Sequence, residues 1–304
     1  MRRLTVLGAL CLVLAAGGHS PPARSAAAEP ASAAGSAAVA VHPGTRAATR
    51  RPGRKNVLAW IDSRSLMQSH GAAVIERLGY ESGLYDTYIR SNAEAAIAPG
   101  SAGQRSELFD LDKFDAIFFL GSIERDLTPQ QRAELIAFVK DDGKGFVGGH
   151  AASDAFQPWD EFAELLGGRL DGHPWGKTDL TFVIENPGFP GLQRLPRILT
   201  RFEESYEIRA LSRDKVDVLM RLDATGMDMS KPHRKDGDYP VAWAKLYGKG
   251  RVYNNILGHE IEVWDNPAIQ TMYFEALKWA LGLTDVKLEP HPLRQVRGTP
   301  APLQ

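Results

Sequence analysis

The pattern of hydrophobic and polar residues changes sharply at KNVLAWID, residues 55–62. This short, mostly apolar run predicts a β-strand buried on both faces, because such strands read as nearly unbroken hydrophobic runs. Residues 65–80 space their apolar side chains as an amphipathic helix does. Residues 81–88 predict a second strand, and the almost wholly apolar residues 115–121 predict a third.

The segment from Thr128 to about Lys140 carries the signals that begin and end a helix. Thr128 offers a capping hydroxyl, Pro129 suits the first turn, and Gln131 completes a capping box. Glycines then allow the chain to leave the helix, and GFVGG, residues 145–149, predicts a fourth strand. Strands and helices that alternate at this spacing predict parallel strands joined by right-handed crossovers.

The remaining strands and the closing helix follow the same logic. Three later segments predict strands: residues 179–185, 215–222 and 240–259, the last as two strands joined by the tight turn YGKG. Residues 266–282 predict an amphipathic helix that begins at Asn266 and Pro267. No internal repeat occurs. We therefore predict one doubly wound, mostly parallel α/β domain over residues 55–284, with ligands bound at the carboxyl ends of its strands.

The two ends of the chain differ from this domain in composition. Residues 1–28 have two arginines, an apolar middle and small residues, which is the layout of a signal peptide and predicts a secreted or periplasmic protein. Its apolar run is shorter than the roughly 20 residues that a spanning helix needs, so no membrane span is expected after cleavage. Residues 29–54 predict a disordered Ala/Pro-rich linker, and residues 285–304 a flexible tail.

Charge and cysteine content narrow the function. Lys plus Arg number 36 and Asp plus Glu 37, so the sequence gives no electrostatic reason to expect a nucleic-acid partner. Cys11 is the only cysteine, and it lies within the predicted signal peptide. The mature chain would then lack both disulfides and a cysteine nucleophile.

Three of the eight histidines have glycines nearby and lie at predicted strand or loop ends: His150, His173 and His259. The others fall on the first helix (His70), in a polar loop (His233), or in the linker and tail, where solvated side chains are expected (His19, His42, His291). His150 is either a hydrogen-bonded turn residue or a functional group. Its place at the carboxyl end of a strand favours the functional interpretation.

Two neighbouring acids, Glu203 and Glu204, lie close to Tyr206. Such acids usually face solvent, but one aimed at a histidine cluster could orient an imidazole, act as a base or bind a metal. None of the spacings is a zinc signature. A divalent metal therefore requires convergence in space, with His150, His173 and His259 as candidate ligands. A Ser153 nucleophile is disfavoured because the Gly-x-Ser-x-Gly elbow is missing.

Several segments, taken in order, resemble the trehalose-utilisation (ThuA-like) family. They are VGGHAASD, LLGGRLDGH, EESYEI, PVAWAKLYGKGRVYNNILGHE and FEALKWALG. The resemblance spans nearly all of residues 55–283, and it implies a three-layer, flavodoxin-like fold similar to the class I glutamine amidotransferases. In those relatives a cysteine nucleophile follows the strand that corresponds to GFVGG. Here His150 stands near that position, so thiolate acyl transfer is excluded.

The resemblance also implies a role in bacterial sugar breakdown, with 3-keto-glycosides supplied by a partner oxidoreductase. It singles out His150, His173, Glu204 and His259 as the polar set that faces the pocket. Two departures stand out. Phe189–Pro190 replaces a His-Pro pair found in many relatives, which removes a possible metal ligand, and Glu203 stands where the family usually has Asp.

The leading hypothesis is an exported enzyme that acts on 3-keto- or ordinary glycosides. One of His150 and His259 would be the base and the other would protonate the leaving oxygen, since imidazole titrates near neutral pH. Glu204 would orient an imidazole, and His173 would polarise a carbonyl or help hold a divalent ion. Predicted substrate contacts are Gly149, Ser153, His173, Tyr206 and Trp159, with Trp175 and Trp264 as further stacking candidates. The alternative is a non-catalytic sugar-binding or accessory module. The sugar, the reaction type and the oligomeric state stay open.

Overall fold

The structure is a computed structural model, and it describes residues 51–62, 64–91, 111–122, 127–294 and 301–302. The predicted signal peptide, residues 1–28, lies outside the described residues, as does the predicted linker up to residue 50. Within the described ranges, no helix is both long and apolar enough to cross a membrane.

One half of the main sheet is parallel. Its strands lie side by side in the order β2, β1, β3, β4 and β11, which is the flavodoxin-like order 2-1-3-4-5. Their bounds are β1 (Lys55–Ile61), β2 (Tyr85–Ser91), β3 (Ala116–Leu120), β4 (Gly145–Gly149) and β11 (Gly250–Asn255). This order confirms the predicted doubly wound α/β fold.

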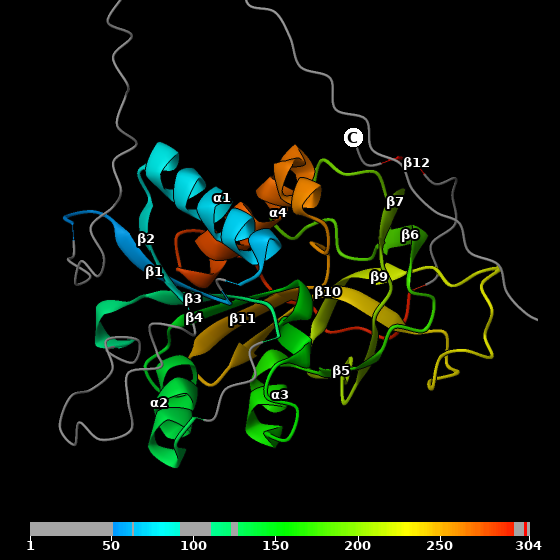
Figure 1. The fold of residues 1–304 in the computed structure, drawn as a ribbon, viewed down its shortest axis with the longest axis horizontal. Coiled ribbons are helices and arrows are strands. Elements are labelled where there is room, and N and C mark those ends of the chain that lie inside the picture. Colours follow the sequence, from blue (N-terminus) through cyan, green and yellow to red (C-terminus); the bar gives the residue numbers. More distant parts are fainter. Residues whose placement is uncertain (1–50, 63, 92–110, 123–126, 295–300, 303–304) are drawn as a thin grey trace, which may run out of the picture. The chain divides into compact units, whose positions relative to one another are not determined.

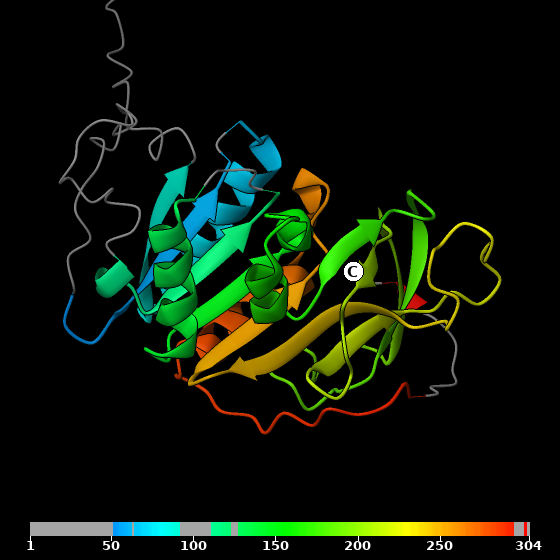
Figure 2. The same cartoon turned by 90° about the horizontal axis from the view of Figure 1, so that it is seen from below.

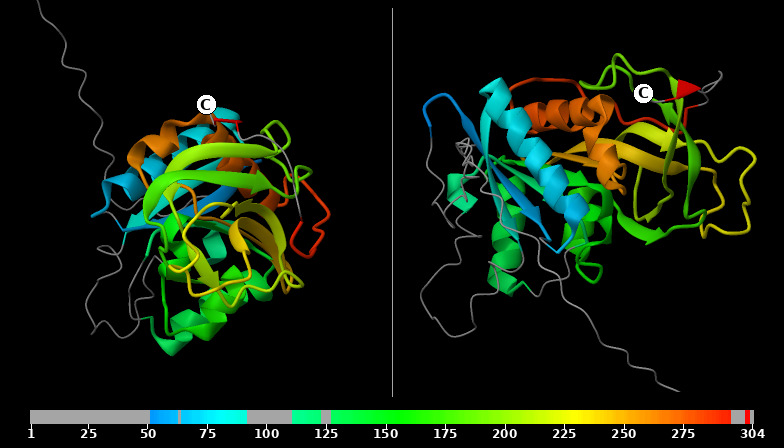
Figure 3. Two further views of the ribbon diagram at one scale, coloured as in Figure 1. Left: turned by 90° about the vertical axis from the view of Figure 1, so that its right-hand side faces the viewer. Right: turned by 45° about the horizontal axis from the view of Figure 1, so that its top comes forward.

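The other half of the sheet continues from β11 with antiparallel strands, in the order β10, β9, β6 and β7. Their bounds are β10 (Tyr239–Tyr247), β9 (Asp217–Leu222), β6 (Lys177–Ile184) and β7 (Ile198–Glu204). The short β12 (Ala301–Pro302) pairs in parallel with β7. A separate two-stranded sheet joins β5 (Arg169–Gly172) to β8 (Glu207–Arg209). The predicted YGKG turn connects β10 to β11. The green and yellow strands of this half lie together on the right in the right-hand view of Figure 3.

Helices cover both faces of the parallel half (Figures 1 and 2). α1 (Leu66–Ser82) and α4 (Pro267–Ala280) lie on one face, and α2 (Pro129–Lys140) and α3 (Asp160–Leu166) lie on the other. The described residues also form three short 3-10 helices: η2 (Leu111–Lys113), η3 (His150–Asp154) and η4 (Ile261–Asp265). Alternate residues of β1 enter different cores. Val57 packs with α1 and α4, whereas Leu58 packs with α2 and α3.

Local signals explain where the helices begin and end. The predicted capping box of α2 forms, because the Thr128 hydroxyl accepts a hydrogen bond from the Gln131 backbone N–H and the Gln131 side-chain oxygen accepts one from the Thr128 backbone N–H. The second strand begins at Tyr85 rather than at residue 81, which corrects the prediction. The reason is that α1 continues to Ser82 and ends at Gly83, whose φ of 71° needs glycine.

The segment after α4 lies against the sheet over residues 285–294. Here the expectation of a solvated His291 is wrong, since the side chain is buried with Nε2 3.2 Å from the Val218 carbonyl oxygen. The buried carboxylates of Glu185 and Asp217 lie within 3.5 and 3.6 Å of the same ring. Acidic partners supplied by distant strands thus replace the solvent that a tail histidine would otherwise contact.

Candidate functional site

The candidate site forms where β4 and β11 end. These strands are parallel neighbours, with Gly149 paired to Asn255, so the residues that follow them leave the sheet at the same edge. His150 comes directly after β4, and His259 comes four residues after β11. Glu204 is the last residue of β7, in the antiparallel half. The predicted catalytic residues therefore reach one place from three separate strands.

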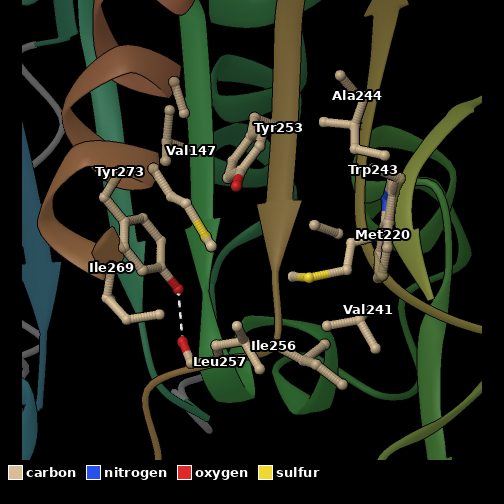
Figure 4. Packing of buried hydrophobic residues seen from close by; sticks show 14 of the residues in the cluster. Val147, Met220, Val241, Trp243, Ala244, Tyr253, Ile256, Leu257, Ile269 and Tyr273 are labelled. Atoms are coloured by element: carbon tan, nitrogen blue, oxygen red, sulfur yellow. Dashed lines mark hydrogen bonds between the residues drawn. The ribbon is translucent and has the colours of Figure 1, made fainter. Parts of the chain in front are cut away.

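Gly149, a predicted substrate contact, is closely packed at the end of β4. A Cβ at this position would lie 2.9 Å from Leu120 Cδ1 and 3.3 Å from the Tyr273 hydroxyl. That hydroxyl also lies 2.8 Å from the Leu257 carbonyl oxygen (Figure 4) and 2.9 Å from the Asn255 carbonyl oxygen. α4 thereby holds the end of β11 against the end of β4.

His150 has an unusual backbone and a fixed side chain. Its φ of 45° lies in the left-handed region, which costs a residue other than glycine roughly 1–2 kcal/mol. Its Nδ1 lies 3.0 Å from the Ile256 carbonyl oxygen. Because a carbonyl only accepts, Nδ1 carries the hydrogen, and Nε2 presents a lone pair when the ring is neutral. The side chain is buried, and burial lowers its pKa to about 4.

The three predicted catalytic side chains converge. Glu204 Oε2 lies 2.9 Å from His259 Nδ1 and 3.8 Å from His150 Nε2, while the two imidazole nitrogens lie 3.2 Å apart. These three atoms all lie close enough to share one ion. Glu204 and His259 are partly exposed, whereas His150 lies beneath them. The arrangement can orient an imidazole by a carboxylate, and it can also bind a cation.

His173 and Tyr206 join the same cluster, as predicted from the sequence. His173 Nε2 lies 3.8 Å from Glu204 Oε2, and its ring meets the Tyr206 ring edge-on at 4.7 Å between centroids. The Tyr206 hydroxyl lies 3.3 Å from His150 Nε2 and can donate to it. Burial raises the pKa of Tyr206 well above its usual value, so the phenol keeps its hydrogen.

Glu203 is an important residue that the sequence reasoning left without a role. Its carboxylate is buried and accepts backbone N–H groups from Glu204, Gly258 and His259 at 3.1–3.2 Å. Burial raises its pKa, and the backbone donors oppose that shift. One carboxylate thus ties the end of β7 to the loop that carries His259. The sequence did hold a signal for this role. Adjacent residues of a strand face opposite sides of the sheet, so one of Glu203 and Glu204 had to point inward.

The remaining predicted substrate contacts are buried or hydrogen-bonded to other groups. Trp159 is buried in the core on the α2 and α3 face, where it stacks on Phe162 at 5.6 Å, so its predicted sugar contact is not supported. Ser153 is buried on η3, and its hydroxyl has no hydrogen-bond partner among the described residues. Trp175 and Trp264 donate their indole N–H groups to backbone carbonyls, of Asp228 and Gly258 respectively.

An ion pair lies beside the cluster on its exposed side. Lys177 Nζ is 2.7 Å from Glu260 Oε1, and the same carboxylate oxygen is 3.7 Å from His259 Nε2. The hydrogen bond from Lys177 lowers the pKa of Glu260. The exposed face of His259 is therefore next to a carboxylate that is already bound to a lysine.

Two other features of the described chain lie outside this cluster. Asp171, Glu207 and His233 form a second group whose ligand atoms lie within 4.8 Å of one another. A cavity of about 230 Å³, lined by Glu164, Lys245 and eight other residues, shares no side chain with the histidine cluster. The chemistry-bearing residues are thus gathered at the strand ends rather than at this cavity.

Comparison with known proteins agrees with the fold. A model of the ThuA family, described as trehalose utilisation, matches residues 56–280. A solved ThuA-like protein from Bacteroides uniformis is similar, with 18% identity, a TM-score of 0.59, and coverage of 78% of this chain and 95% of that one. A solved ThuA-like protein from Parabacteroides merdae is also similar, with 18% identity and a TM-score of 0.58. The match covers 79% of this chain and 94% of that one. No curated protein sequence matches this chain.

Proposed function

The chain belongs to the ThuA family, a carbohydrate-related family described as trehalose utilisation, and from this premise we propose that it is an exported glycoside-cleaving enzyme. The observation that carries the proposal is the 2.9 Å contact between Glu204 Oε2 and His259 Nδ1. A carboxylate that accepts the Nδ1 hydrogen leaves Nε2 of the same ring with a lone pair. His259 is partly exposed, so this lone pair is available to a substrate.

His259 is the better of the two candidate bases. The sequence offered His150 and His259 as alternatives, and burial separates them. His150 is 4% exposed and its Nε2 already faces Tyr206 and His259, so a sugar has little access to it. We assign His150 the task of holding the Tyr206 hydroxyl and packing beneath His259. General-base catalysis by a positioned imidazole is typically worth 10²–10⁴ in rate.

The proposed substrate is a 3-keto-glycoside, and the bond changes are as follows. His259 removes the hydrogen on C2, which the C3 carbonyl acidifies, and an enolate forms. The enolate then re-forms the carbonyl, a C1–C2 double bond forms, and the C1–oxygen bond breaks. The departing glycosidic oxygen takes the proton that His259 removed from C2, so His259 returns to its neutral form. No oxidant is consumed in these steps, because the 3-keto group is made beforehand by a sugar oxidoreductase.

His173 is the proposed partner of the carbonyl, and the Tyr206 ring packs edge-on against it. His173 is the more exposed of the two and lies at the rim beside Glu204. Its Nε2 can donate to an oxygen that gains negative charge in the enolate. Tyr206 keeps its hydrogen at neutral pH because burial raises its pKa. That hydrogen is directed to His150 Nε2, so Tyr206 positions the cluster while the more exposed His173 supplies the donor to the carbonyl.

Export is the part of the proposal that rests on the start of the chain. Residues 1–28 have the basic, apolar and small-residue sections of a signal peptide. A fusion of residues 1–54 to a reporter enzyme that is active only outside the cytoplasm should give signal. A reporter that stays in the cytoplasm would contradict export and would leave the chemistry of the site untouched.

The test of the activity uses the purified mature chain and a 3-keto-disaccharide. We expect release of the free aglycone sugar, and a loss of 10²–10⁴ in rate in His259→Asn and Glu204→Gln. His70→Asn is the matched control, because His70 pairs with Asp265 and is not part of the cluster. Binding of the sugar without turnover in the wild-type protein would favour the alternative, a sugar-binding or accessory module.

A further inference from the structure

We propose that His150, His173, Glu204 and His259 form a binding site for one divalent transition-metal ion, which competes with the hydrogen bond between Glu204 and His259. The ion site stands on geometry alone. Its consequence for catalysis rests on the proposed function, since an ion at this position would occupy the base.

The spacing of the ligand atoms fits one ion. The three closest atoms lie 2.9, 3.2 and 3.8 Å apart, taken from Glu204 to His259, His259 to His150, and Glu204 to His150. Two ligand atoms at 2.0–2.1 Å from a tetrahedral zinc ion lie about 3.3–3.4 Å apart. The observed distances bracket that value, so small side-chain movements are enough to place an ion between the three atoms.

A fourth ligand is within reach. His173 Nε2 lies 3.8 Å from the same oxygen, Glu204 Oε2, but it is not among the three atoms that all lie within 4.8 Å of one another, so His173 becomes the fourth ligand by a side-chain movement. His173 follows β5, His150 follows β4, and His259 follows β11. Three nitrogen ligands and one carboxylate favour zinc, cobalt, nickel or copper over magnesium and calcium, which prefer oxygen.

The hydrogen bond of His150 is the arrangement that metal-binding histidines use. In such sites the second ring nitrogen donates to a carbonyl or carboxylate, which fixes the tautomer and aims the lone pair at the ion. His150 Nδ1 faces the Ile256 carbonyl oxygen in this way, and Nε2 points into the cluster. The buried Glu203 carboxylate holds the backbone of Glu204 and His259, so both side chains are anchored.

Neighbouring charges do not oppose a cation. Lys177 is bound to Glu260 beside the cluster, and Arg201 Nε lies 3.9 Å from the Glu203 carboxylate. Glu203, Glu204 and Glu260 therefore supply three carboxylates around or beneath the three imidazoles. This balance lowers the cost of bringing a dipositive ion to the strand ends.

Ion binding and the base form of His259 exclude one another. To bind the ion, His259 must present the lone pair of Nδ1, so the ring hydrogen moves to Nε2. His259 then no longer donates a hydrogen bond to Glu204. Because Nε2 now carries the hydrogen, it cannot accept a proton from a substrate. A zinc-loaded protein would be inactive in the proposed elimination.

Binding is tested with the metal alone. Calorimetry of ZnCl₂ into the chelator-stripped mature chain should show one site, and CoCl₂ should give the visible absorption of a cobalt ion with nitrogen ligands. His150→Ala and Glu204→Gln should weaken binding at least about tenfold, and His173→Ala, at an exposed position, provides a third variant that does not disturb the core. Absence of binding in the wild-type chain would overturn the site.

The second histidine–carboxylate group supplies the matched control. His233→Ala removes the only imidazole of the Asp171, Glu207 and His233 group and should leave zinc affinity unchanged. If His233→Ala abolishes binding while His150→Ala preserves it, the ion belongs to that group and the proposal is wrong.

Competition is tested without an activity assay. With ¹⁵N-labelled histidine, the Nδ1 hydrogen of His259 should be lost and an Nε2 hydrogen should appear after one equivalent of zinc. An Nδ1 hydrogen that persists in the zinc-bound protein would overturn the competition. If zinc binds as expected but no 3-keto-glycoside is cleaved by the metal-free protein, the proposed function fails and the ion site stands.

Discussion

The Nδ1 atom of His150 lies 3.0 Å from the carbonyl oxygen of Ile256. This contact joins the first residue after β4 to the first residue after β11, so the two strand ends hold each other through the site itself. It also fixes which nitrogen of His150 carries the hydrogen, because a carbonyl cannot donate. A neutral, buried imidazole is thereby built into the fold, and several measurable properties follow from it.

The stability of the metal-free protein should fall in acid partly because of His150. Burial lowers the pKa of this ring from 6.5 to about 4. Between pH 6.5 and about 4 the unfolded chain therefore binds a proton that the folded chain does not bind. The contribution is fully present above pH 6.5 and is lost as pH falls through 4. We expect a slope of about 1.4 kcal/mol per pH unit, on the order of 3 kcal/mol in all.

Urea unfolding between pH 4 and 7, in the presence of a chelator, measures this slope. Other acidic groups also titrate in this range, so the informative quantity is the difference between the wild type and His150→Gln. The variant should show a flatter dependence of the free energy of unfolding on pH. Parallel curves for the two proteins would mean that His150 titrates normally in the folded state.

Replacement of Glu203 by alanine should destabilise the protein by about 2–4 kcal/mol, because three backbone N–H groups would lose a buried charged acceptor. Cleavage should fall further than the folded fraction explains, since these bonds fix both Glu204 and His259. Glu203→Gln keeps one acceptor oxygen, so its stability should lie between those of the wild type and Glu203→Ala. Equal stability of the wild type and Glu203→Ala would show that the carboxylate does not hold the loop.

Tyr273 on α4 offers a test of how the helix supports the site from a distance. Tyr273→Phe removes the hydroxyl that reaches the Asn255 and Leu257 carbonyl oxygens, and we expect a loss of about 1–2 kcal/mol in the free energy of unfolding (Figure 4). Gly149→Ala should cost about 1–3 kcal/mol, since its Cβ would meet Leu120 and the same hydroxyl. Denaturant midpoints at constant m-value measure both. An unchanged midpoint for Gly149→Ala would mean that the strand ends are packed less tightly.

Substitutions at Trp159 and Tyr206 should distinguish a residue that packs in the core from one that supports catalysis. Trp159→Phe removes part of an aromatic stack in the core, so we expect a loss of about 1–3 kcal/mol in stability and an unchanged KM. Tyr206→Phe removes only a hydroxyl that faces His150, so we expect a change in kcat or KM together with a loss of about 1 kcal/mol in stability. A raised KM in Trp159→Phe would restore the sugar-contact role that the buried position argues against.

The fold was largely readable from the sequence because its signals are local. Unbroken apolar runs such as the one over β3 indicate strands covered on both faces, and the capping box at Thr128 marks a helix start by itself. β5, β7 and β8 were not predicted, because these strands are defined by pairing with partners that are distant along the chain. The extent of α1 depended on the single glycine that ends it.

The candidate site divides in the same way. The sequence by itself determined which residues could do chemistry, since glycines beside His150 and His259 mark strand ends, and strand ends in this architecture bind ligands. Only the tertiary structure decided which of them meet, which imidazole is buried, and that Trp159 belongs to the core. Those outcomes depend on the pairing of β4 with β11 and on the reach of β7 across the sheet. Contacts between residues more than fifty positions apart leave no local pattern in the sequence of a single chain. These contacts nevertheless decide the function of the site, because burial sets the pKa of His150 and hydrogen bonding sets Glu204 as the partner of His259.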